Sequence, residues 1–145
     1  MWHGGPDDAG IYLDDQFPLA FGFRRLSFLD LSEHGHQPMT DAQKQVVLIF
    51  NGEIYNYQEI KKELTENEFQ STSDTEVIIY AYLKWGLSCF SRFNGMFAIA
   101  LFDKRVNKLF LARDHAGIKP LYYCLDKGML HFASEVEHSL IQAIE

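Results

Sequence analysis

Gln45–Asn56 reads QVVLIFNGEIYN, an apolar β-branched run followed directly by an Asn-Gly pair. A continuous apolar run of this length is typical of a buried strand, and it predicts a strand over Val46–Phe50. An Asn-Gly pair after such a run is a strong turn signal. The sequence therefore predicts that the strand ends at Asn51-Gly52, in a plain hairpin turn or in a loop that carries a site.

Three neighbouring groups in this stretch suit an amide substrate. The Asn51 side chain and the Gly52 backbone N–H can both donate to an oxyanion, and the Glu53 carboxylate can accept from a substrate ammonium. From these residues alone, a hairpin turn without any chemical role is the favoured explanation of the Asn-Gly pair. The rest of the chain has to decide between the two interpretations.

Length and composition fit a single globular domain over residues 1–145, with 47% apolar and 14% aromatic residues. The formal net charge of −7, without a Lys or Arg cluster, argues against nucleic acid or an anionic membrane as a partner. Cys89 and Cys124 lack the spacing of a disulfide framework or zinc site and are predicted to be inert core thiols. His34 and His36 have no further ligands at metal-site spacing, so no metal is predicted. With no membrane-length apolar run and no signal peptide pattern, we expect a cytoplasmic domain.

Strand signals dominate the first and last thirds of the chain. Short polar connections at Asp103–Asn107 and Asp126–Gly128 predict two hairpins near the C-terminus. The expected strands are Pro18–Leu29, Val46–Phe50, Gly95–Phe102, Lys108–Ala112, Leu121–Leu125 and Met129–Ala133.

Helix signals lie between these strands and at the end. Tyr57–Asn67 places apolar residues four apart on a polar background, which predicts an amphipathic helix. Ser73–Glu76 has the capping-box pattern and opens a second helix that Gly86 ends. Ser134–Glu137 has the same pattern and opens a helix to about Ile144. Hairpins with separate helices predict an α+β fold with mostly antiparallel sheets.

Seven motifs follow one another along the chain: Gly5–Gly10, Arg24–Ser27, Gln37–Met39, Asn51–Asn56, Ser73–Ile78, Asn94–Ala98 and Ala112–Tyr123. Together they resemble the glutaminase domain of glutamine-hydrolysing asparagine synthetases. That domain is a class II glutamine amidotransferase domain of the N-terminal-nucleophile hydrolase type. The resemblance implies a four-layer α/β/β/α sandwich, here truncated at the N-terminus.

The resemblance also implies a mechanism. The nucleophile of such domains is the thiol of an N-terminal cysteine, with its own α-amino group as the base. The thiol attacks the side-chain amide of glutamine, releases ammonia and leaves a glutamyl thioester for water to hydrolyse. Asn51 and Gly52 match the oxyanion hole, and Glu53 matches a further substrate contact. Arg25 matches the group that binds the α-carboxylate and Asp74 the group that binds the α-ammonium of L-glutamine.

The chain departs from the family pattern in its first residues. It begins at Met1, downstream of the cysteine-bearing segment, and Gly4 and Phe23 stand where the family commonly has Arg and His. Cys89 and Cys124 carry no free α-amine, so we expect no glutaminase activity from this chain alone. No cofactor is implied for this domain. ATP and Mg would serve only a synthetase domain supplied elsewhere, with a separate synthetase chain as the partner.

Two alternatives to a glutaminase domain stay open: a catalytically dead glutamine-binding or regulatory module, and a structural assembly domain. A sheet without its first strand exposes unpaired backbone groups and an apolar face, which predicts a homo-oligomer. The Ala112-Arg113-Asp114 segment is predicted to be a buried structural ion pair or a turn.

Overall fold

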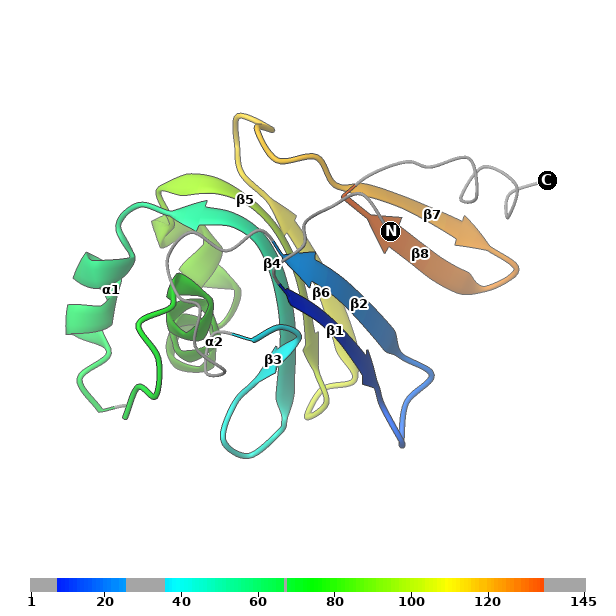
Figure 1. The fold of residues 1–145 in the computed structure, drawn as a ribbon, viewed down its shortest axis with the longest axis horizontal. Coiled ribbons are helices and arrows are strands. Elements are labelled where there is room, and N and C mark those ends of the chain that lie inside the picture. Colours follow the sequence, from blue (N-terminus) through cyan, green and yellow to red (C-terminus); the bar gives the residue numbers. More distant parts are fainter. Residues whose placement is uncertain (1–7, 26–35, 67, 135–145) are drawn as a thin grey trace.

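A four-stranded antiparallel sheet forms the centre of the computed structural model, which describes residues 8–25, 36–66 and 68–134 (Figure 1). Its strands, in spatial order, are β3 (Met39–Thr40), β4 (Val46–Ile54), β5 (Gly95–Asp103) and β6 (Lys108–Arg113). β4 and β5 pair along their whole length, although all the described helices lie between them in the sequence. This long pair is the framework on which the other elements pack.

The helices cover one face of this sheet. They are α1 (Tyr57–Glu63), α2 (Asp74–Trp85) and the 3₁₀ helix η2 (Gly86–Arg92). Because side chains alternate along a strand, every second residue of β4 faces the helices. The core between the two layers includes the following fully buried side chains: Val46, Leu48, Ile54, Leu64, Val77, Ile78, Ile79, Ile99 and Leu101.

Two β-hairpins cover the opposite face of the sheet (Figure 1). Their strands are β1 (Asp8–Leu13) with β2 (Ala20–Arg25), and β7 (Tyr122–Asp126) with β8 (Met129–Ala133). Phe21 of β2 and Phe132 of β8 meet edge to face, with ring centroids 5.6 Å apart. Phe21 packs in one cluster with Val47 and Phe102 of the central sheet. The described residues therefore form three layers, in the order helices, sheet, hairpins.

Most predicted elements are confirmed, with shifted ends. The hairpin strands of β5–β8 lie within about one residue of their predicted ranges. The first helix is shorter than predicted and ends at Glu63, but it still buries Ile60. Of the predicted strand Pro18–Leu29, β2 occupies Ala20–Arg25, and residues 26–29 lie outside the described residues. The short strand β3 and the strand β1 had no sequence signal that we used.

The predicted end of the strand at Asn51-Gly52 is wrong, and so is the interpretation of this pair as a hairpin turn. β4 continues through both residues to Ile54 and pairs with β5 throughout. Gly52 adopts a φ of 147°, and a Cβ atom there would collide with the carbonyl oxygen of Met96 on β5. Here the glycine permits a close approach of two strands rather than a turn.

The capping box at Ser73–Glu76 is only half confirmed. Ser73 is the N-cap of α2, and its hydroxyl accepts from the N–H of Thr75 at 3.1 Å. The Glu76 carboxylate does not complete a capping box; it accepts from the N–H groups of Gln70 and Ser71 and from the Ser71 hydroxyl. Glu76 therefore fastens the preceding loop to the helix, and it supplies the acceptor that the buried Ser71 needs.

The second helical layer of the expected four-layer sandwich is not among the described residues, since the predicted helix from Ser134 falls on residues 135–144.

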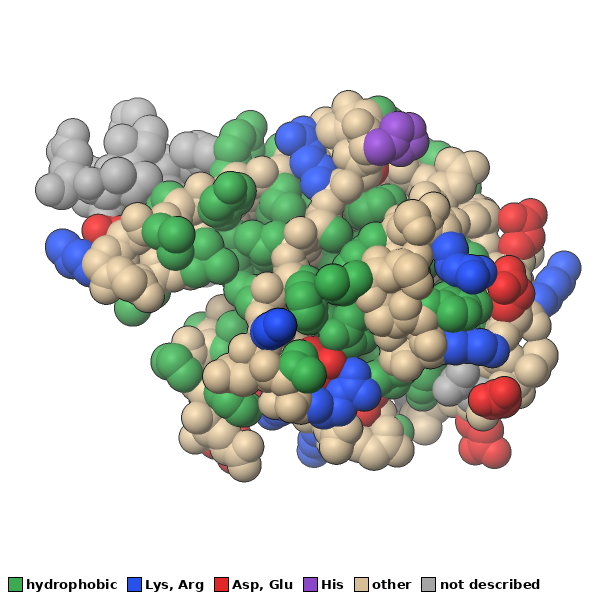
Figure 2. Space-filling view, turned by 180° about the vertical axis from the view of Figure 1, so that it is seen from behind, with side chains coloured by type: hydrophobic (Ala, Val, Ile, Leu, Met, Phe, Trp, Pro, Cys, Tyr) green, Lys and Arg blue, Asp and Glu red, His purple; other side chains and the backbone are tan. Residues whose placement is uncertain are grey.

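The hairpins carry large exposed apolar side chains, and Figure 2 shows apolar groups over much of one face of the molecule. The most exposed of them on the hairpins are Ile11, Leu13, Tyr123, Leu125 and Met129. The predicted homo-oligomer stays a prediction. No helix in the described part of the chain is long and apolar enough to cross a membrane.

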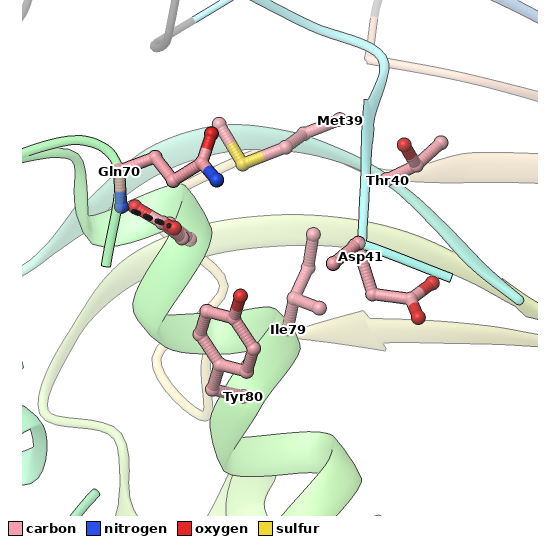
Figure 3. A pocket seen from close by; sticks show the side chains of 8 residues that line it. Met39, Thr40, Asp41, Gln70, Ile79 and Tyr80 are labelled. Atoms are coloured by element: carbon pink, nitrogen blue, oxygen red, sulfur yellow. Dashed lines mark hydrogen bonds between the residues drawn. The ribbon is translucent and has the colours of Figure 1, made fainter. Parts of the chain in front are cut away.

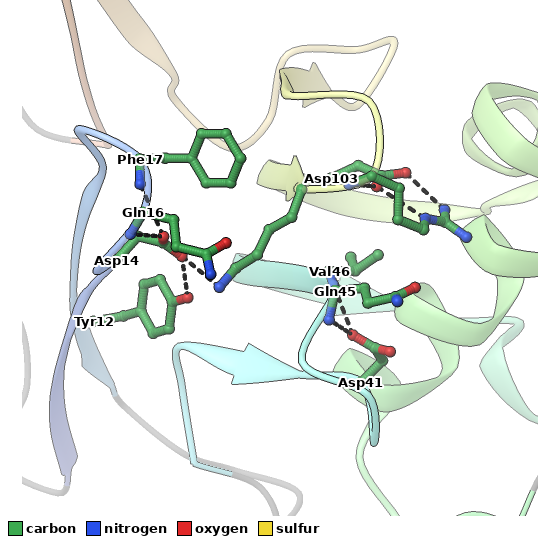
Figure 4. A network of polar contacts seen from close by, with 10 residues as sticks. Tyr12, Asp14, Gln16, Phe17, Asp41, Gln45, Val46 and Asp103 are labelled. Carbon is green, nitrogen blue, oxygen red and sulfur yellow. Dashed lines mark hydrogen bonds and ion pairs between the residues drawn. The ribbon is translucent and has the colours of Figure 1, made fainter.

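A charged clip fastens the β1–β2 hairpin to the central sheet (Figure 4). Asp14, whose side chain is fully buried, accepts from Lys104 and from the Tyr12 hydroxyl, both at 2.5 Å. It also accepts from the N–H groups of Gln16 and Phe17. Burial opposes ionisation of Asp14, but these bonds outweigh it and hold the pKa of the carboxyl well below its ordinary value. The clip therefore stays charged at neutral pH.

We expect the variant Asp14→Asn to unfold at lower urea concentration than the unmodified chain at about pH 7. A depressed carboxyl pKa contributes stability above the ordinary pKa of 3.8 and loses it as the pH falls toward the folded-state pKa. The difference in the urea midpoint of unfolding between Asp14→Asn and the unmodified chain should therefore narrow at about pH 3. The control is Asp15→Asn at the neighbouring exposed residue, whose urea midpoint should stay close to that of the unmodified chain at both pH values. A pH-independent difference for Asp14→Asn would contradict this account.

Candidate functional site

The far end of β4 has one edge that β5 does not cover. Gly52 lies opposite Phe97 in the β4–β5 register. The Phe97 N–H donates to the Asp114 carboxylate at 3.1 Å, and the Phe97 carbonyl accepts from the Asp114 N–H at 2.9 Å. Both bonds lie on the side of β5 away from β4. Gly52 and Phe97 therefore form a pair without hydrogen bonds between them, and the Gly52 N–H points to the edge of β4 away from β5. Short β3 pairs only with Val47 and Leu48, so none of the described strands pairs with that edge at Gly52.

Along this edge, the backbone N–H groups on either side of the Gly52 N–H donate to side-chain oxygens. The side-chain oxygen of Gln37 accepts from the Phe50 N–H at 2.7 Å. A carboxylate oxygen of Asp74 accepts from the Ile54 N–H at 3.0 Å. The N–H groups of residues 50, 52 and 54 share one edge because backbone donors alternate along a strand. The Gly52 N–H is thus held between two anchored neighbours, which is the arrangement that a preorganised oxyanion donor needs.

The predicted residues Asn51 and Glu53 flank this donor. Both are half-buried, and strand alternation places them with Val47 and Ile49, on the face toward the hairpins. Asp74 bonds the neighbouring Ile54 and lies close enough to Glu53 to feel its charge, so Gly52, Glu53 and Asp74 lie near one another at this end of β4, with Asn51 next to Gly52 along the strand. The backbone of Arg25 ends β2 in the hairpin layer, and its side chain lies outside the described part of the structure.

Asp74 is the most unusual acid of the group. It is 5% exposed and begins α2, where its carboxylate approaches β4. Burial raises the pKa of Asp74, and the nearby Glu53 charge adds to this, whereas the N–H groups of Ile54 and Thr75 oppose it. A buried carboxylate whose ionised form is disfavoured in this way favours a cationic ligand, because the cation compensates the negative charge.

Asp114 supports the opposite side of β5. Its carboxylate accepts from the N–H groups of Phe97, Ile118 and Lys119. Burial opposes its ionisation, but these bonds lower the pKa of Asp114 to about 2. The exposed guanidinium of Arg113 donates to the carbonyls of Gly117 and Lys119. Neither alternative predicted for Ala112-Arg113-Asp114 holds as stated: Ala112 and Arg113 end β6, the turn follows Asp114, and the two charged side chains bond backbone groups instead of each other.

The two thiols lie in different surroundings. Cys89 lies on η2 with its side chain buried, and burial raises its pKa to about 12, as expected for an inert core thiol. Cys124 lies on β7 and is half-buried rather than in the core. Neither residue belongs to the elements that form the β4 edge.

A separate small hollow of about 120 Å³ lies between α2 and the turn after β3 (Figure 3). Asp41, Gln70, Glu76 and Tyr80 are among the residues that line it. The Glu76 carboxylate already accepts three hydrogen bonds from the loop before α2, so it has little capacity for a ligand. None of the predicted site residues lines this hollow.

Comparison with known proteins supplies the family. The sequence matches the glutamine amidotransferase domain family over residues 1–144. This chain belongs to that family. The amidotransferase domain is 47% identical to the glutamine-hydrolyzing asparagine synthetase 2 of Bacillus subtilis (strain 168), over 92% of the chain. It is 43% identical to asparagine synthetase 1 of the same organism, again over 92% of the chain.

The domain spans about a fifth of the length of these relatives, 17% of the first and 21% of the second. Its fold is similar to that of glutamine phosphoribosylpyrophosphate amidotransferase from B. subtilis, whose structure is a complex with ADP and GMP. The TM-score is 0.67 at 23% identity, over 79% of this chain and 27% of that one. The shared feature is the fold, a mixed α and β arrangement with antiparallel sheets.

Four of the residues predicted from the sequence, Asn51, Gly52, Glu53 and Asp74, lie at the candidate site, but the sequence did not indicate two residues that bond the same strands. Gln37 belongs to a family motif, yet no spacing or periodicity indicated that its side chain would reach Phe50. Asp114 was expected to belong to a buried ion pair or a turn, whereas its carboxylate accepts from the N–H of Phe97, which is distant in the sequence. Both contacts join segments far apart in the chain, which a local pattern does not report.

Proposed function

We propose that this chain is the glutamine-binding part of a glutaminase domain in an asparagine-synthetase-like protein. The observation that carries the proposal is the β4 edge, where the Gly52 N–H lies between anchored neighbours beside the buried Asp74 carboxylate. In this proposal Gly52 and Asn51 donate to the carbonyl oxygen of the glutamine amide. Asp74, with Glu53 nearby, pairs with the α-ammonium, and Arg25 binds the α-carboxylate.

We expect the 145-residue chain alone to bind glutamine without releasing ammonia from it. Hydrolysis in this family requires a thiol that attacks the amide carbon and a base that takes its proton. The Cys89 thiol is buried, with its pKa raised to about 12, so almost none of it is thiolate at neutral pH. Cys124 lies on the β7–β8 hairpin and is not part of the β4 edge. A chain that supplied an N-terminal cysteine at this edge would restore hydrolysis.

Calorimetric titration of the purified chain with L-glutamine, with ammonia followed in parallel, tests the proposal. We expect saturable binding without ammonia, and much weaker binding of D-glutamine, which reverses the α-substituents. Absence of binding would overturn the glutamine site and favour the structural assembly role. Ammonia release would overturn the argument from the thiols.

The affinity for glutamine should fall as the pH is lowered, and it should do so above the range of an ordinary carboxyl group. Pairing with the ammonium requires ionised Asp74, whose pKa is raised by burial and by Glu53. Below that pKa the affinity should drop about tenfold per pH unit. Titrations from about pH 8 to about pH 4 would show the midpoint.

The variant Glu53→Gln is the matched test of this pH dependence. It removes the neighbouring charge that raises the pKa of Asp74, so the midpoint should move to lower pH even where the affinity itself is weaker. An affinity that is flat down to the ordinary carboxyl pKa of 3.8 would contradict the assignment of Asp74 to the ammonium.

A further inference from the structure

We infer that Gln37 is a positioning residue of the glutamine site, which holds the donor edge of β4 at a fixed distance from the helix that carries Asp74. This inference rests on the proposed function and deepens it. Gln37 does not touch the substrate in this account. It acts through the backbone of β4 and the first turn of α2.

The contacts of the Gln37 amide reach both elements of the site. Its oxygen accepts from the Phe50 N–H at 2.7 Å, and its nitrogen donates to the Thr75 hydroxyl at 3.3 Å. Gln37 and Thr75 are each 3% exposed, so water has little access to replace either bond. Loss of a partner would leave buried polar groups unsatisfied.

The two residues that Gln37 contacts adjoin the site residues in the sequence. Phe50 precedes Asn51 on β4, and Thr75 follows Asp74 on α2. A second bridge, from Asp74 to the Ile54 N–H, joins the same two elements beyond Gly52. Two bridges on either side of the Gly52 donor restrict both sliding and rotation of the strand against the helix. The separation between the oxyanion donor and the ammonium-binding carboxylate is thereby set.

The register of the sheet explains why a side chain performs this task. Met39 and Thr40 pair with Leu48 and Val47, and the same register would continue to Gln37 opposite Phe50. The strand β3 begins only at Met39, so the Phe50 N–H bonds the side-chain oxygen of Gln37 in place of a ladder partner. The backbone of Gln37 is itself confined, because its carbonyl lies against Gly10 of β1, where a Cβ atom would have no room.

The glutamine amide has the acceptor and the donor for both contacts. The Phe50 N–H needs an acceptor, and the amide nitrogen supplies a donor to the Thr75 hydroxyl. Methionine has nearly the same shape but neither group, so Gln37→Met removes both bonds while it preserves packing. Thr75→Val removes only the link to α2, and Thr75→Ser restores the hydroxyl.

The test combines glutamine titration with amide hydrogen exchange on the 145-residue chain and these three variants. We expect Gln37→Met to weaken glutamine binding roughly tenfold and Thr75→Val about fivefold, with near-complete rescue by Thr75→Ser. Exchange should accelerate at the Phe50 amide, which loses its acceptor, but stay unchanged at Leu48, nearer the start of β4. A purely structural residue would instead accelerate exchange along the whole strand.

The outcomes separate this inference from the proposed function. Full affinity in Gln37→Met, with the unmodified chain binding glutamine, would overturn the inference and leave the proposed function intact. If the unmodified chain does not bind glutamine, the proposed function fails, and with it the role of Gln37 in a glutamine site. The exchange pattern would then show only whether Gln37 fastens β4. Uniform acceleration along β4 in Gln37→Met would also overturn the inference.

Discussion

Gly52→Ala should destabilise the fold by about 4 kcal/mol or more, a large share of the roughly 5 to 15 kcal/mol typical of a folded domain. The added Cβ atom would collide with the Met96 carbonyl oxygen and lie 2.8 Å from the Cα atom of Phe97. Both atoms belong to the backbone of β5, which is paired with β4 along its length and cannot move aside cheaply. The positive φ of 147° adds strain for any residue with a side chain.

The matched control for this variant is Gly128→Ala. Gly128 also has a positive φ, 83°, but a Cβ atom there would meet nothing within 4 Å. This control therefore carries only the conformational cost, about 1 kcal/mol. Urea unfolding followed by circular dichroism would compare the two. Equal losses of stability would contradict the close approach of β4 and β5 at Gly52.

Asp74→Asn should weaken glutamine binding roughly 100-fold or more without weakening the fold. A neutral amide cannot pair with the α-ammonium as a carboxylate does. The amide oxygen can still accept from the Ile54 N–H, so the bridge between β4 and α2 survives. Calorimetric titration would measure the affinity and thermal unfolding the stability.

The sign of the stability change follows from the raised pKa of Asp74. A carboxyl group with a raised pKa contributes stability below its ordinary pKa and loses that contribution as the pH rises through the raised value. At neutral pH the ionised, buried Asp74 therefore weakens the fold, and Asp74→Asn should leave the melting temperature unchanged or raise it by a few degrees. This is the pattern expected where stability is given up for binding.

The control for this variant is Glu63→Gln, on an exposed ion pair with Arg92 at 3.3 Å. It removes one negative charge at the surface and should change neither glutamine binding nor stability appreciably. A large loss of stability in Asp74→Asn would instead mean that the Asp74 charge holds the fold together. Unchanged binding would remove Asp74 from the site.

Local patterns predicted the elements whose formation depends on local chemistry. The hairpins β5–β6 and β7–β8 follow from apolar runs joined by short polar turns, and α2 follows from its Ser73 cap and its end at Gly86. The pattern failed at Asn51-Gly52, because a turn signal and a close strand approach use the same glycine. What lies across the sheet decides between them, and Phe97 and Met96 are far from Gly52 in the sequence.

The sequence by itself determined the family, the hairpins and helices, and the identity of the residues that form the candidate site. Only the tertiary structure decided how these residues work together. It left the Gly52 N–H on an edge that no described strand covers, buried Asp74 near it, and used Gln37 to join the strand to the helix. The reason is physical: burial and hydrogen-bond partners depend on which distant segments meet, and residue spacing along the chain carries no record of that meeting.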